Sequence, residues 1–439
     1  MSNCFLAIDI GASSGRHIIG KFNGTEIVLE EVYRFKNGAD EIDGRLYWDL
    51  DRLFSNIKEG IKKAFSVSKN IKSLAIDTWG VDYVLLNGDE EILPVFAYRD
   101  ERGAKAALKV HGIIPFKELY SKTGISYEPF NSIYQLYDDK INGRLDKATD
   151  FLMLPEYFSY KLTGVKSKEW TEATTTGLVN AKTGEFDFDI ISRLGLKKEL
   201  FKPLSVPPKK IGNLKPELVK ELGGDCEVVL CASHDTASAI YAIDMEENAP
   251  YISSGTWSIL GIKTPNAIVD CGENLSNEGG VGYYCHQKNI MGMWLVNRLK
   301  EEVCPDASFI EIADMASKSE YSVIFDVNDS TLYAPKNMKQ AILALLEKKG
   351  EKMPKNNADI FSSIYHSLAF GYAKTYKEIE KNTKTTYNLL YVVGGGGKNK
   401  LLVSLTEKYL GKKVIALPIE GTSLGNIKIQ YERWENKKQ

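Results

Sequence analysis

The sequence predicts an α/β protein of two domains, each with a mixed β-sheet flanked by helices. A chain of 439 residues exceeds one ordinary core and fits two domains of about 200 residues each. Near the N-terminus, strand-like and helix-like segments follow one another in the order β-β-β-α-β. A strand, small-residue turn and strand at 7–19 return at 251–262, half a chain later. We therefore predict a boundary near Met245, with domains 1–245 and 246–439.

Composition and charge exclude several classes of protein. Hydrophobic residues make up 43% of the chain and charged residues 26%, values typical of a globular protein. The 56 basic and 58 acidic residues nearly cancel, so no basic excess points to nucleic acid or an anionic membrane. No apolar run approaches the roughly 20 residues of a membrane span, and no signal peptide is apparent. The six scattered cysteines lack a CxxC pair, which favours a reduced, cytoplasmic protein. We expect a monomer or a homodimer.

The predicted elements of the N-terminal half follow from apolar spacing. Strands are expected at 5–10, 17–22, 26–35, 73–76 and 83–86. Apolar residues at helical spacing predict a helix at 49–65, capped by Asp49 or Asp51. The segment 102–222 is mostly helix and loop and does not divide cleanly into elements.

The second half repeats the α/β pattern. A strand at 227–230 leads to a short helix of small residues at 237–240, and a strand pair is expected at 251–262. Later come a long helix at 358–379, a strand at 389–393, four glycines, and a helix at 398–410. A strand, glycines and a helix in this order would place backbone N–H groups at a helix start.

The first candidate for phosphate chemistry is the loop that follows the first strand. Small residues at 11–15 would let the backbone approach a phosphate, and Arg16 could add a charge-assisted bond. Asp9, at the strand end, could hold a hydrated Mg²⁺ ion, which keeps most of its waters. The alternative is a simple hairpin turn with a solvated aspartate.

Two further loops have the same character. The Ser254-Gly255-Thr256 turn offers a hydroxyl, on Thr256, to a terminal phosphate. The four glycines of 394–397 would let a purine or ribose lie on bare backbone, although they could also be a flexible end of an element.

The best candidate for acid–base work is Asp235. It follows a buried-type strand and precedes the helix of small residues, so its carboxylate could take a proton from a substrate hydroxyl as that oxygen attacks phosphorus. The alternative is that Asp235 only caps the helix. Its position in the sequence does not decide between the two.

Polar and aromatic residues gather at other strand ends. The segments 77–82 and 98–100 combine Trp79, Arg99 and aspartates, a usual means of holding a polyhydroxylated molecule. Trp79 could instead be a core residue. Segments 277–280 and 288–292 could line the same cleft.

Taken in order, these segments resemble the FGGY family of carbohydrate kinases, which belongs to the actin/hexokinase-like ATPase superfamily. The matching segments are 9–16, 76–82, 97–100, 233–239, 253–258, 277–280, 288–292 and 393–396. Two local sequences favour the rhamnulokinase branch over xylulokinases, glycerol kinases and fuculokinases: Ala12-Ser13-Ser14-Gly15-Arg16 and Ser233-His234-Asp235-Thr236. The similarity extends from the first strand to about Gln430.

The resemblance implies a fold and a set of roles. The fold would be two ribonuclease-H-like domains that close over a central cleft and exclude water. Asp235 would be the catalytic base, and Asp9 the Mg²⁺ residue. The ATP contacts would be Ala12, Ser13, Ser14, Gly15, Arg16, Thr256, Asn297, Gly395 and Gly396. The sugar contacts would be Thr78, Trp79, Gly80, Arg99, His234, Asp235, Thr236 and Asn289.

The reaction implied is transfer of the γ-phosphoryl group of MgATP to the 1-hydroxyl of L-rhamnulose, in L-rhamnose catabolism. Two alternatives remain open: a kinase for another ketose or polyol, such as xylulose or fuculose, and a non-catalytic sugar or nucleotide sensor. Two departures from the family are visible. Asn297 stands where the family commonly has Gln, and the sequence ends at Gln439, where relatives add further helix, so a shortened C-terminal domain is expected.

Overall fold

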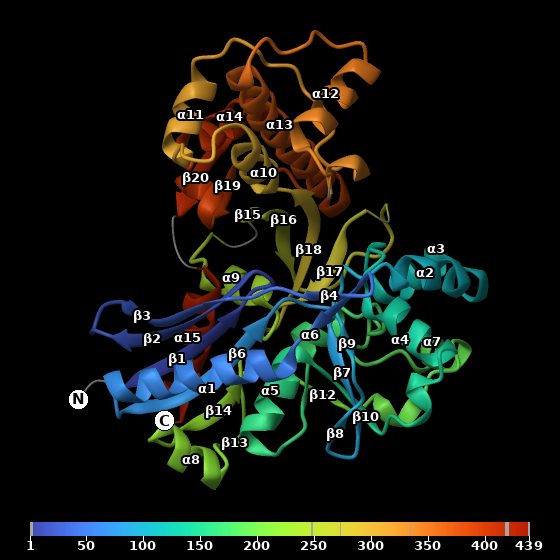
Figure 1. Ribbon diagram of the computed structural model, residues 1–439, viewed down its shortest axis with the longest axis vertical. Coiled ribbons are helices and arrows are strands. Elements are labelled where there is room, and N and C mark those ends of the chain that lie inside the picture. The colour runs from blue at the N-terminus through green and yellow to red at the C-terminus, as the bar shows by residue number, and fades with distance from the viewer. Residues whose placement is uncertain (1–2, 247–248, 273, 334, 418–420, 438–439) are drawn as a thin grey trace. The chain divides into compact units, whose positions relative to one another are not determined.

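The computed structural model describes residues 3–246, 249–272, 274–333, 335–417 and 421–437 (Figure 1). These residues form two compact units. The first unit takes its residues from 1–244, 264–285 and 421–439, and the second from 245–263 and 286–420. The division into domains at Met245 stays a prediction. The two units differ from it because the segments 264–285 and 421–439 belong to the first unit.

The first unit is built on a six-stranded sheet of order β13-β14-β6-β1-β2-β3. Its strands are β1 Cys4–Ile10, β2 Ser14–Phe22, β3 Ile27–Lys36, β6 Ile71–Thr78, β13 Lys209–Asn213 and β14 Glu227–Leu230. Strand β1 is antiparallel to β2 and parallel to β6, and β6 is parallel to β14. Because parallel strands end at the same edge, the residues that follow β1, β6 and β14 gather there.

Side chains of β1 alternate between the two faces of this sheet, as the strand period requires. Leu6 and Ile8 join the core under helix α1 (Leu50–Val67). Phe5 and Ala7 pack on the other face with Ile427 of helix α15 (Gly421–Asn436). Asp9, two residues after Ala7, therefore faces α15.

Helix α1 confirms the predicted helix at 49–65 and settles its start. Asp49 is the N-cap, and its side chain accepts a hydrogen bond from the backbone N–H of Arg52 at 2.8 Å. The predicted apolar stripe is the buried face of the helix.

The remaining strands of the first unit form short ladders. They are β4 Asp40–Ile42, β5 Arg45–Trp48 and β9 Val95–Phe96 in one sheet, β10 Asp150–Met153, β7 Tyr83–Asn87 and β8 Glu90–Glu91 in another, and β11 Lys168–Glu169 with β12 Leu204–Ser205. Strand β17 Ser276–Gly279, whose residues also belong to this unit, is not part of these ladders. The strand predicted at 83–86 thus forms, but in a separate sheet from β6.

The segment 102–222, which the sequence did not divide, carries most of the helices of the first unit and a second apolar core around Tyr83, Val110, Leu136 and Phe151. The helices are α2 Arg102–Ile113, α3 Phe116–Thr123, α4 Ser132–Ile141, α5 Leu154–Thr163, α6 Trp170–Thr174, α7 Phe188–Arg193, α8 Pro216–Leu222 and, after β14, α9 Asp235–Ala242, with 3-10 turns at Arg144–Asp146 and Lys198–Leu200.

The second unit repeats the strand pattern of the first. Its sheet has the order β18-β16-β15-β19-β20. Strand β15 is antiparallel to β16 and parallel to β19, as β1 is to β2 and β6, and β19 is parallel to β20. The recurrence of the strand–turn–strand pattern in the sequence therefore corresponds to a repeated topology.

The elements of the second unit are the strands β15 Tyr251–Ser254, β16 Trp257–Thr264, β18 Tyr284–Met291, β19 Leu389–Val393 and β20 Lys413–Leu417, the helices α10 Trp294–Val303, α11 Phe309–Ser317, α12 Met338–Lys348, α13 Asn357–Thr383 and α14 Lys400–Leu410, and 3-10 turns at Ser330–Leu332 and Gly395–Lys398. The chain passes from one unit to the other within β16 and β18. Among the described residues, no helix combines the length and the apolar character needed to span a bilayer.

Helix α15 crosses α9 at very short range. A Cβ atom at Gly425 would lie 1.8 Å from the carbonyl oxygen of Ser238, and one at Gly421 would lie 3.3 Å from the Cβ of Ala239. Both neighbours belong to the helix that begins at Asp235. The crossing therefore fixes α9 against the C-terminal helix.

Replacing Gly425 with Ala tests this crossing. Because the backbone of α9 must move to admit the methyl group, we expect G425A to lower the free energy of unfolding by about 1–3 kcal/mol, measured by urea denaturation. The matched control is G112A in α2, where an added Cβ meets nothing within 4 Å and helix propensity improves. Equal stability of G425A and the unmodified protein would contradict the close crossing.

Candidate functional site

Three aspartates lie at the carboxyl edge of the first sheet. Asp9 and Asp77 are register partners on the parallel strands β1 and β6. A backbone bridge between Thr78 and His234 brings the start of α9, and with it Asp235, to the same edge. Burial, and after it repulsion from the neighbouring carboxyl groups, raises the pKa values of Asp77 and Asp235.

Asp9 is held by partners from two directions. Arg16, its cross-strand neighbour on β2, donates through Nε at 2.9 Å, and its Nη2 lies 2.9 Å from the same carboxylate oxygen. Ser423 of α15 donates its hydroxyl at 3.0 Å. Asp9 therefore has a compensated charge and a fixed position.

Asp77 is fully buried and less well satisfied. Asn426 of α15 donates its amide to one carboxylate oxygen, and the other oxygen, Oδ1, has no hydrogen-bond partner among the described residues. Burial, followed by repulsion from Asp9, raises the pKa of Asp77 well above its usual value, while Asn426 lowers it. A buried carboxyl group with an unpaired oxygen is costly unless a proton or a cation compensates it.

Asp235 is the most exposed of the three carboxylates, since 32% of its side chain is accessible against 9% for Asp9. Enclosure by protein atoms, together with repulsion from Asp9, raises its pKa to about 7. The hydroxyl of Thr236 donates to it at 3.1 Å and opposes the rise. His234 occupies the N-cap of α9 and its side chain forms no capping bond, whereas Asp235 is the first residue of the helix.

His234 lies between two carboxylates. Its Nε2 is 3.6 Å from Asp235, and its Nδ1 is 3.4 Å from Glu278 of β17. Burial lowers the pKa of His234, while Glu278 raises it. The segment 277–280 therefore contributes a charged group to this edge, as the sequence suggested.

Helix α6 anchors the segment 233–235. Glu169 is the N-cap of this helix, and its carboxylate accepts hydrogen bonds from the N–H groups of Thr171 at 2.8 Å and Ser233 at 3.3 Å. The hydroxyl of Thr171 in turn accepts from the N–H of His234 at 3.2 Å. Burial raises the pKa of Glu169 to about 7.

The predicted sugar-binding residues 78–80 follow β6. Thr78 is fully buried and donates its hydroxyl to the carbonyl of Trp79 at 2.9 Å. The ring of Trp79 is only 8% exposed and lies 4.4 Å, centroid to centroid, from the ring of Trp48. This is the core placement that the sequence left open for Trp79. A Cβ at Gly80 would lie 2.8 Å from the side chain of Thr175, so only glycine fits there.

Asp82 accepts hydrogen bonds from several separate segments of the first unit. Its carboxylate accepts the indole N–H groups of Trp48 at 2.6 Å and Trp79 at 2.9 Å, the backbone N–H of Tyr98 at 3.0 Å, and the amide of Gln135 at 3.3 Å. Burial raises its pKa to about 6, and these bonds lower it.

Val81, between Gly80 and Asp82, has a φ of 70°, a left-handed conformation that is strained for a β-branched residue. The hydroxyl of Thr175 accepts from the N–H of Val81 at 3.1 Å, and Ser132 donates to its carbonyl at 2.6 Å. Side chains from two other segments therefore hold the strained backbone in place.

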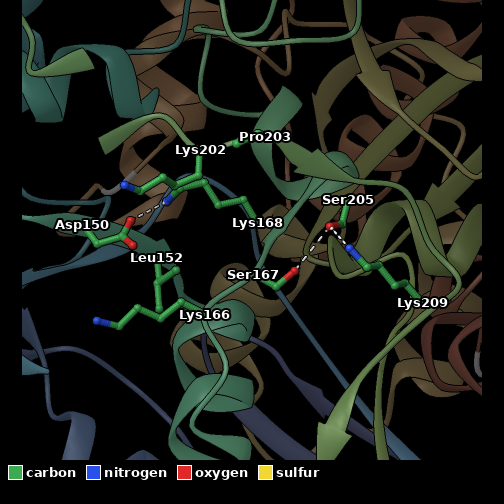
Figure 2. A pocket seen from close by; sticks show the side chains of 9 residues that line it. All are labelled: Asp150, Leu152, Lys166, Ser167, Lys168, Lys202, Pro203, Ser205 and Lys209. Atoms are coloured by element: carbon green, nitrogen blue, oxygen red, sulfur yellow. Dashed lines mark hydrogen bonds and ion pairs between the residues drawn. The ribbon is translucent and has the colours of Figure 1, made fainter. Parts of the chain in front are cut away.

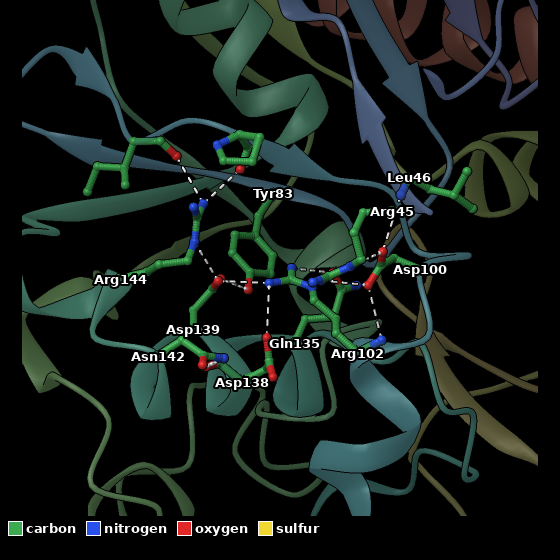
Figure 3. A network of polar contacts seen from close by, with 12 residues as sticks. Arg45, Leu46, Tyr83, Asp100, Arg102, Gln135, Asp138, Asp139, Asn142 and Arg144 are labelled. Atoms are coloured by element: carbon green, nitrogen blue, oxygen red, sulfur yellow. Dashed lines mark hydrogen bonds and ion pairs between the residues drawn. The ribbon is translucent and has the colours of Figure 1, made fainter. Parts of the chain in front are cut away.

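A charged network fixes both ends of the loop that carries Arg99 (Figure 3). Arg45 binds Asp100, the residue after Arg99, with two bonds of 2.7 and 2.9 Å, and α2 begins two residues later at Arg102. Within α2, Arg102 is buried and donates to Asp139 at 2.7 Å. Arg99 itself is exposed and donates to the hydroxyl of Tyr98 at 3.0 Å.

The first predicted phosphate loop is a fixed turn between β1 and β2. The N–H of Gly11 donates to Ser14 at 2.9 Å, and Asn37 donates through its amide to Gly11 and through its backbone to Ser13. Ser13 is exposed, and Ala12, Ser14 and Arg16 are half-buried. Packing explains the glycine at position 15, because a Cβ there would lie 2.2 Å from the ring of Phe35.

The remaining predicted contacts belong to the second unit. Thr256 is exposed in the turn between β15 and β16, and its carbonyl accepts from Trp294 at 3.2 Å, at the start of α10. Asn297, one turn further along α10, and Asn289 on β18 are half-buried.

The glycine segment differs from its prediction in one respect. The helix does not begin at Lys398 against the glycines: residues 395–398 form a 3-10 turn, and α14 begins at Lys400 with Asn399 as its N-cap. The side chain of Asn399 satisfies the N–H of Leu402 at 3.0 Å. Gly395 is exposed, whereas Gly396 packs so closely that a Cβ would lie 1.9 Å from Ser254 Oγ. Bare backbone for a ligand is therefore offered at Gly395.

Comparison with known proteins identifies the family. Models of the N-terminal and the C-terminal domain of the FGGY family of carbohydrate kinases match residues 4–242 and 250–431. The chain belongs to the FGGY family of carbohydrate kinases. As an FGGY kinase it uses ATP as phosphoryl donor and a sugar-type molecule as acceptor, and it has the two-domain α/β fold of that family.

Relatives and solved structures agree with this assignment. The FGGY kinase is 40% identical to the rhamnulokinase of Oceanobacillus iheyensis over 98% of this chain and 93% of the relative, and 36% identical to that of Bacillus subtilis over 97% and 89%. The crystal structure of ligand-bound xylulose kinase from Lactobacillus acidophilus has a TM-score of 0.83 at 18% identity, over 99% of this chain and 90% of that one. Glycerol kinase of Plasmodium falciparum with ADP has a TM-score of 0.77 at 18% identity, over 98% and 89%.

Sequence reasoning missed the polar stripe of α15 in this kinase. Ser423, Asn426 and Gln430 are fully buried, and they bind Asp9, Asp77 and Ser73 respectively. Their spacing of three and four residues places them on one face of a helix. That spacing was the available signal.

Replacing Asp82 with Asn tests how far this carboxylate holds together the loops that carry Trp48, Trp79 and Tyr98. An amide cannot satisfy both the indole donors and the amide of Gln135, so we expect D82N to lower the free energy of unfolding by about 1–3 kcal/mol in urea at pH 8. The fluorescence of Trp48 and Trp79 reports the change. D146N, at an exposed aspartate, is the control, and identical unfolding curves for D82N and D146N would contradict the role of Asp82.

Proposed function

We propose that this FGGY kinase transfers the γ-phosphoryl group of ATP to the 1-hydroxyl of L-rhamnulose. The reaction rests on one observation, the accessible carboxylate of Asp235 at the start of α9 with a pKa of about 7. The substrate rests on six relatives named rhamnulokinase, which are 35–40% identical over 97–98% of the chain.

In the proposed reaction, Asp235 accepts the proton of the ketose hydroxyl while its oxygen bonds to the γ-phosphorus. The bond to the β,γ-bridging oxygen breaks and ADP leaves. A base whose pKa lies near neutral pH is present as carboxylate and still takes a proton readily. Thr236 orients the carboxylate, and α15 fixes the helix that carries it.

The phosphates would be bound by Ala12, Ser13, Ser14 and Arg16 in the first unit and by Thr256 in the second, with Gly395 and Asn297 toward the nucleoside. The ketose would contact Gly80, Arg99, His234, Thr236 and Asn289. The two units would then correspond to a sugar-side and a nucleotide-side domain, as the division at Met245 predicts.

The donor set at the sheet edge suits a hydrated Mg²⁺ ion. Among the described residues, no three His, Cys, Asp or Glu side chains are arranged to bind a metal directly. The unpaired oxygen of buried Asp77 and the carboxylate of Asp9 offer negative charge to an ion that keeps its own waters. Asp9 and Asp77 would hold it, and it would supply positive charge to the transferring phosphoryl group.

A substrate panel tests the proposed acceptor. ADP formation is measured by a coupled assay with L-rhamnulose, xylulose, fuculose and glycerol, each at the same concentrations. We expect kcat/KM to be highest for L-rhamnulose. A higher value for another acceptor would assign that substrate instead, and the absence of ketose-dependent ADP formation with every acceptor would favour a sensor.

Replacing Asp235 with Asn tests the base. We expect D235N to bind ATP and ketose as before and to lose phosphorylation by about 10²–10⁴-fold, because the hydroxyl then lacks a proton acceptor. The matched control is D244N, at an exposed aspartate just beyond the other end of α9. A kcat within a few-fold of the unmodified enzyme would remove Asp235 from the reaction.

The same assignment predicts the pH dependence of kcat/KM for the ketose. Asp235 is active as carboxylate, so kcat/KM should rise about tenfold per pH unit below its pKa of about 7 and level off above it. Initial rates between pH 5.5 and 8.5 measure this limb. A flat profile through pH 6 would show that the group in control has its ordinary, lower pKa.

A further inference from the structure

A small basic pocket of about 200 Å³ lies in the first unit (Figure 2), and none of its lining residues is among those assigned to the reaction. It is formed where β10, β11 and β12 meet the start of β13. Its lining residues are Asp150, Leu152, Lys166, Ser167, Lys168, Lys202, Pro203, Ser205 and Lys209. The volume is below the about 300–1,000 Å³ of sites for larger organic ligands, so only a small molecule or group fits.

Four lysines face a single carboxylate in this pocket. Lys168 is paired with Asp150 at 3.0 Å, and Lys166 with Asp89, outside the pocket, at 3.0 Å. Within the part of the chain that the structure describes, Lys202 and Lys209 form no ion pair with a carboxylate. Two positive charges therefore remain uncompensated.

Lys168 is a buried cation, with a side chain only 3% exposed. Its ammonium lies 3.9 Å from the ring centroid of Phe151 and donates to the carbonyl of that residue. Burial lowers its pKa, Asp150 and Glu156 raise it, and the nearby charge of Lys202 lowers it again. The pocket thus keeps a costly positive charge next to a second one, an arrangement that an anion would stabilise.

Hydroxyl groups complete the lining at the other end, where Figure 2 places Lys209 against the two serines. The ammonium of Lys209 donates to Ser205 Oγ at 2.9 Å, and Ser167 Oγ lies 3.4 Å from Ser205 Oγ. The parallel pairing of β11 with β12 fixes the spacing of these residues. Ammonium and hydroxyl groups therefore both line the pocket, and together they suit a group with several acceptor oxygens.

We propose that this pocket binds a tetrahedral oxyanion: inorganic phosphate or the phosphate group of a small ester. Lys202 and Lys209 supply the uncompensated charge, and Ser167 and Ser205 supply neutral donors. The phosphate group has the charge and the number of acceptors that the lining matches, whereas a carboxylate would leave donors unused.

The pocket is joined to the segment that carries Asp235 by one residue of chain. Lys168 lines the pocket, and the next residue, Glu169, accepts from the N–H of Ser233. Anion binding should therefore tighten both β11 with β12 and the anchor of that segment, which amide hydrogen exchange reports.

The test is calorimetric titration of the whole protein, with ADP at saturation to occupy the nucleotide site, using inorganic phosphate, glycerol 2-phosphate and acetate. We expect a phosphate-type anion to bind more tightly than acetate, and the K202Q/K209Q double variant to bind it at least about tenfold more weakly. The control variant K198Q/K220Q removes two exposed lysines elsewhere in this unit and should bind as before. The tighter of the two phosphate compounds identifies the source of the group.

Hydrogen exchange of the unmodified protein gives an independent reading should the double variant fail to fold. Phosphate should slow exchange in peptides covering 166–172 and 203–209 in the presence of ADP. The proposal is overturned by the absence of phosphate binding to the ADP-saturated protein, by equal binding of acetate, by equal affinity in K202Q/K209Q, or by unchanged exchange in these peptides. None of these readings depends on kinase activity.

Discussion

The hydrogen bonds from helix α15 to the buried aspartates are the constraint on which the first unit depends. Ser423 and Asn426 reach Asp9 and Asp77, and Gln430 reaches Ser73, across one face of the sheet. Neighbouring buried carboxyl groups repel one another, so they require donors that stay in place. Because Gly425 on the same helix packs against α9, this helix also fixes the start of Asp235's helix. Helix α15 must therefore pack against β1, β6 and α9 before the surroundings of Asp235 are complete.

Much of the fold could be predicted because its signals are local. The strands that became β1 and β19 are short, nearly continuous apolar runs, and the helices that became α1 and α13 carry apolar residues at helical spacing. The segment 102–222 gave no such signal, since its short helices are held by a core whose partners, such as Tyr83 and Phe151, are far apart in sequence. The start of α14 was misplaced because the glycines formed a 3-10 turn, and an asparagine beyond them became the cap.

The candidate site divides in the same way. Asp9 and Asp235 were predicted because each stands at or just after the end of a buried strand, and the structure brings both to one sheet edge. Asp77 lay within a segment assigned to sugar binding, and its pairing with Asn426 joins residues 349 positions apart. The basic pocket gave no sequence signal either, because strands of two residues bring its lysines together. Features that need partners from distant segments are the ones that a single sequence conceals.

The left-handed backbone at Val81 bears on acceptor discrimination under the proposal that the neighbouring Gly80 contacts the ketose. A β-branched residue with a positive φ keeps that conformation only while hydrogen bonds hold it, here from Thr175 and Ser132 to the N–H and carbonyl of Val81. The turn is therefore held in one conformation. A surface of this kind is already formed before a ligand binds. It would reject an ill-fitting epimer outright instead of adjusting to it, and the breadth of acceptors would be set by residues that never touch a sugar.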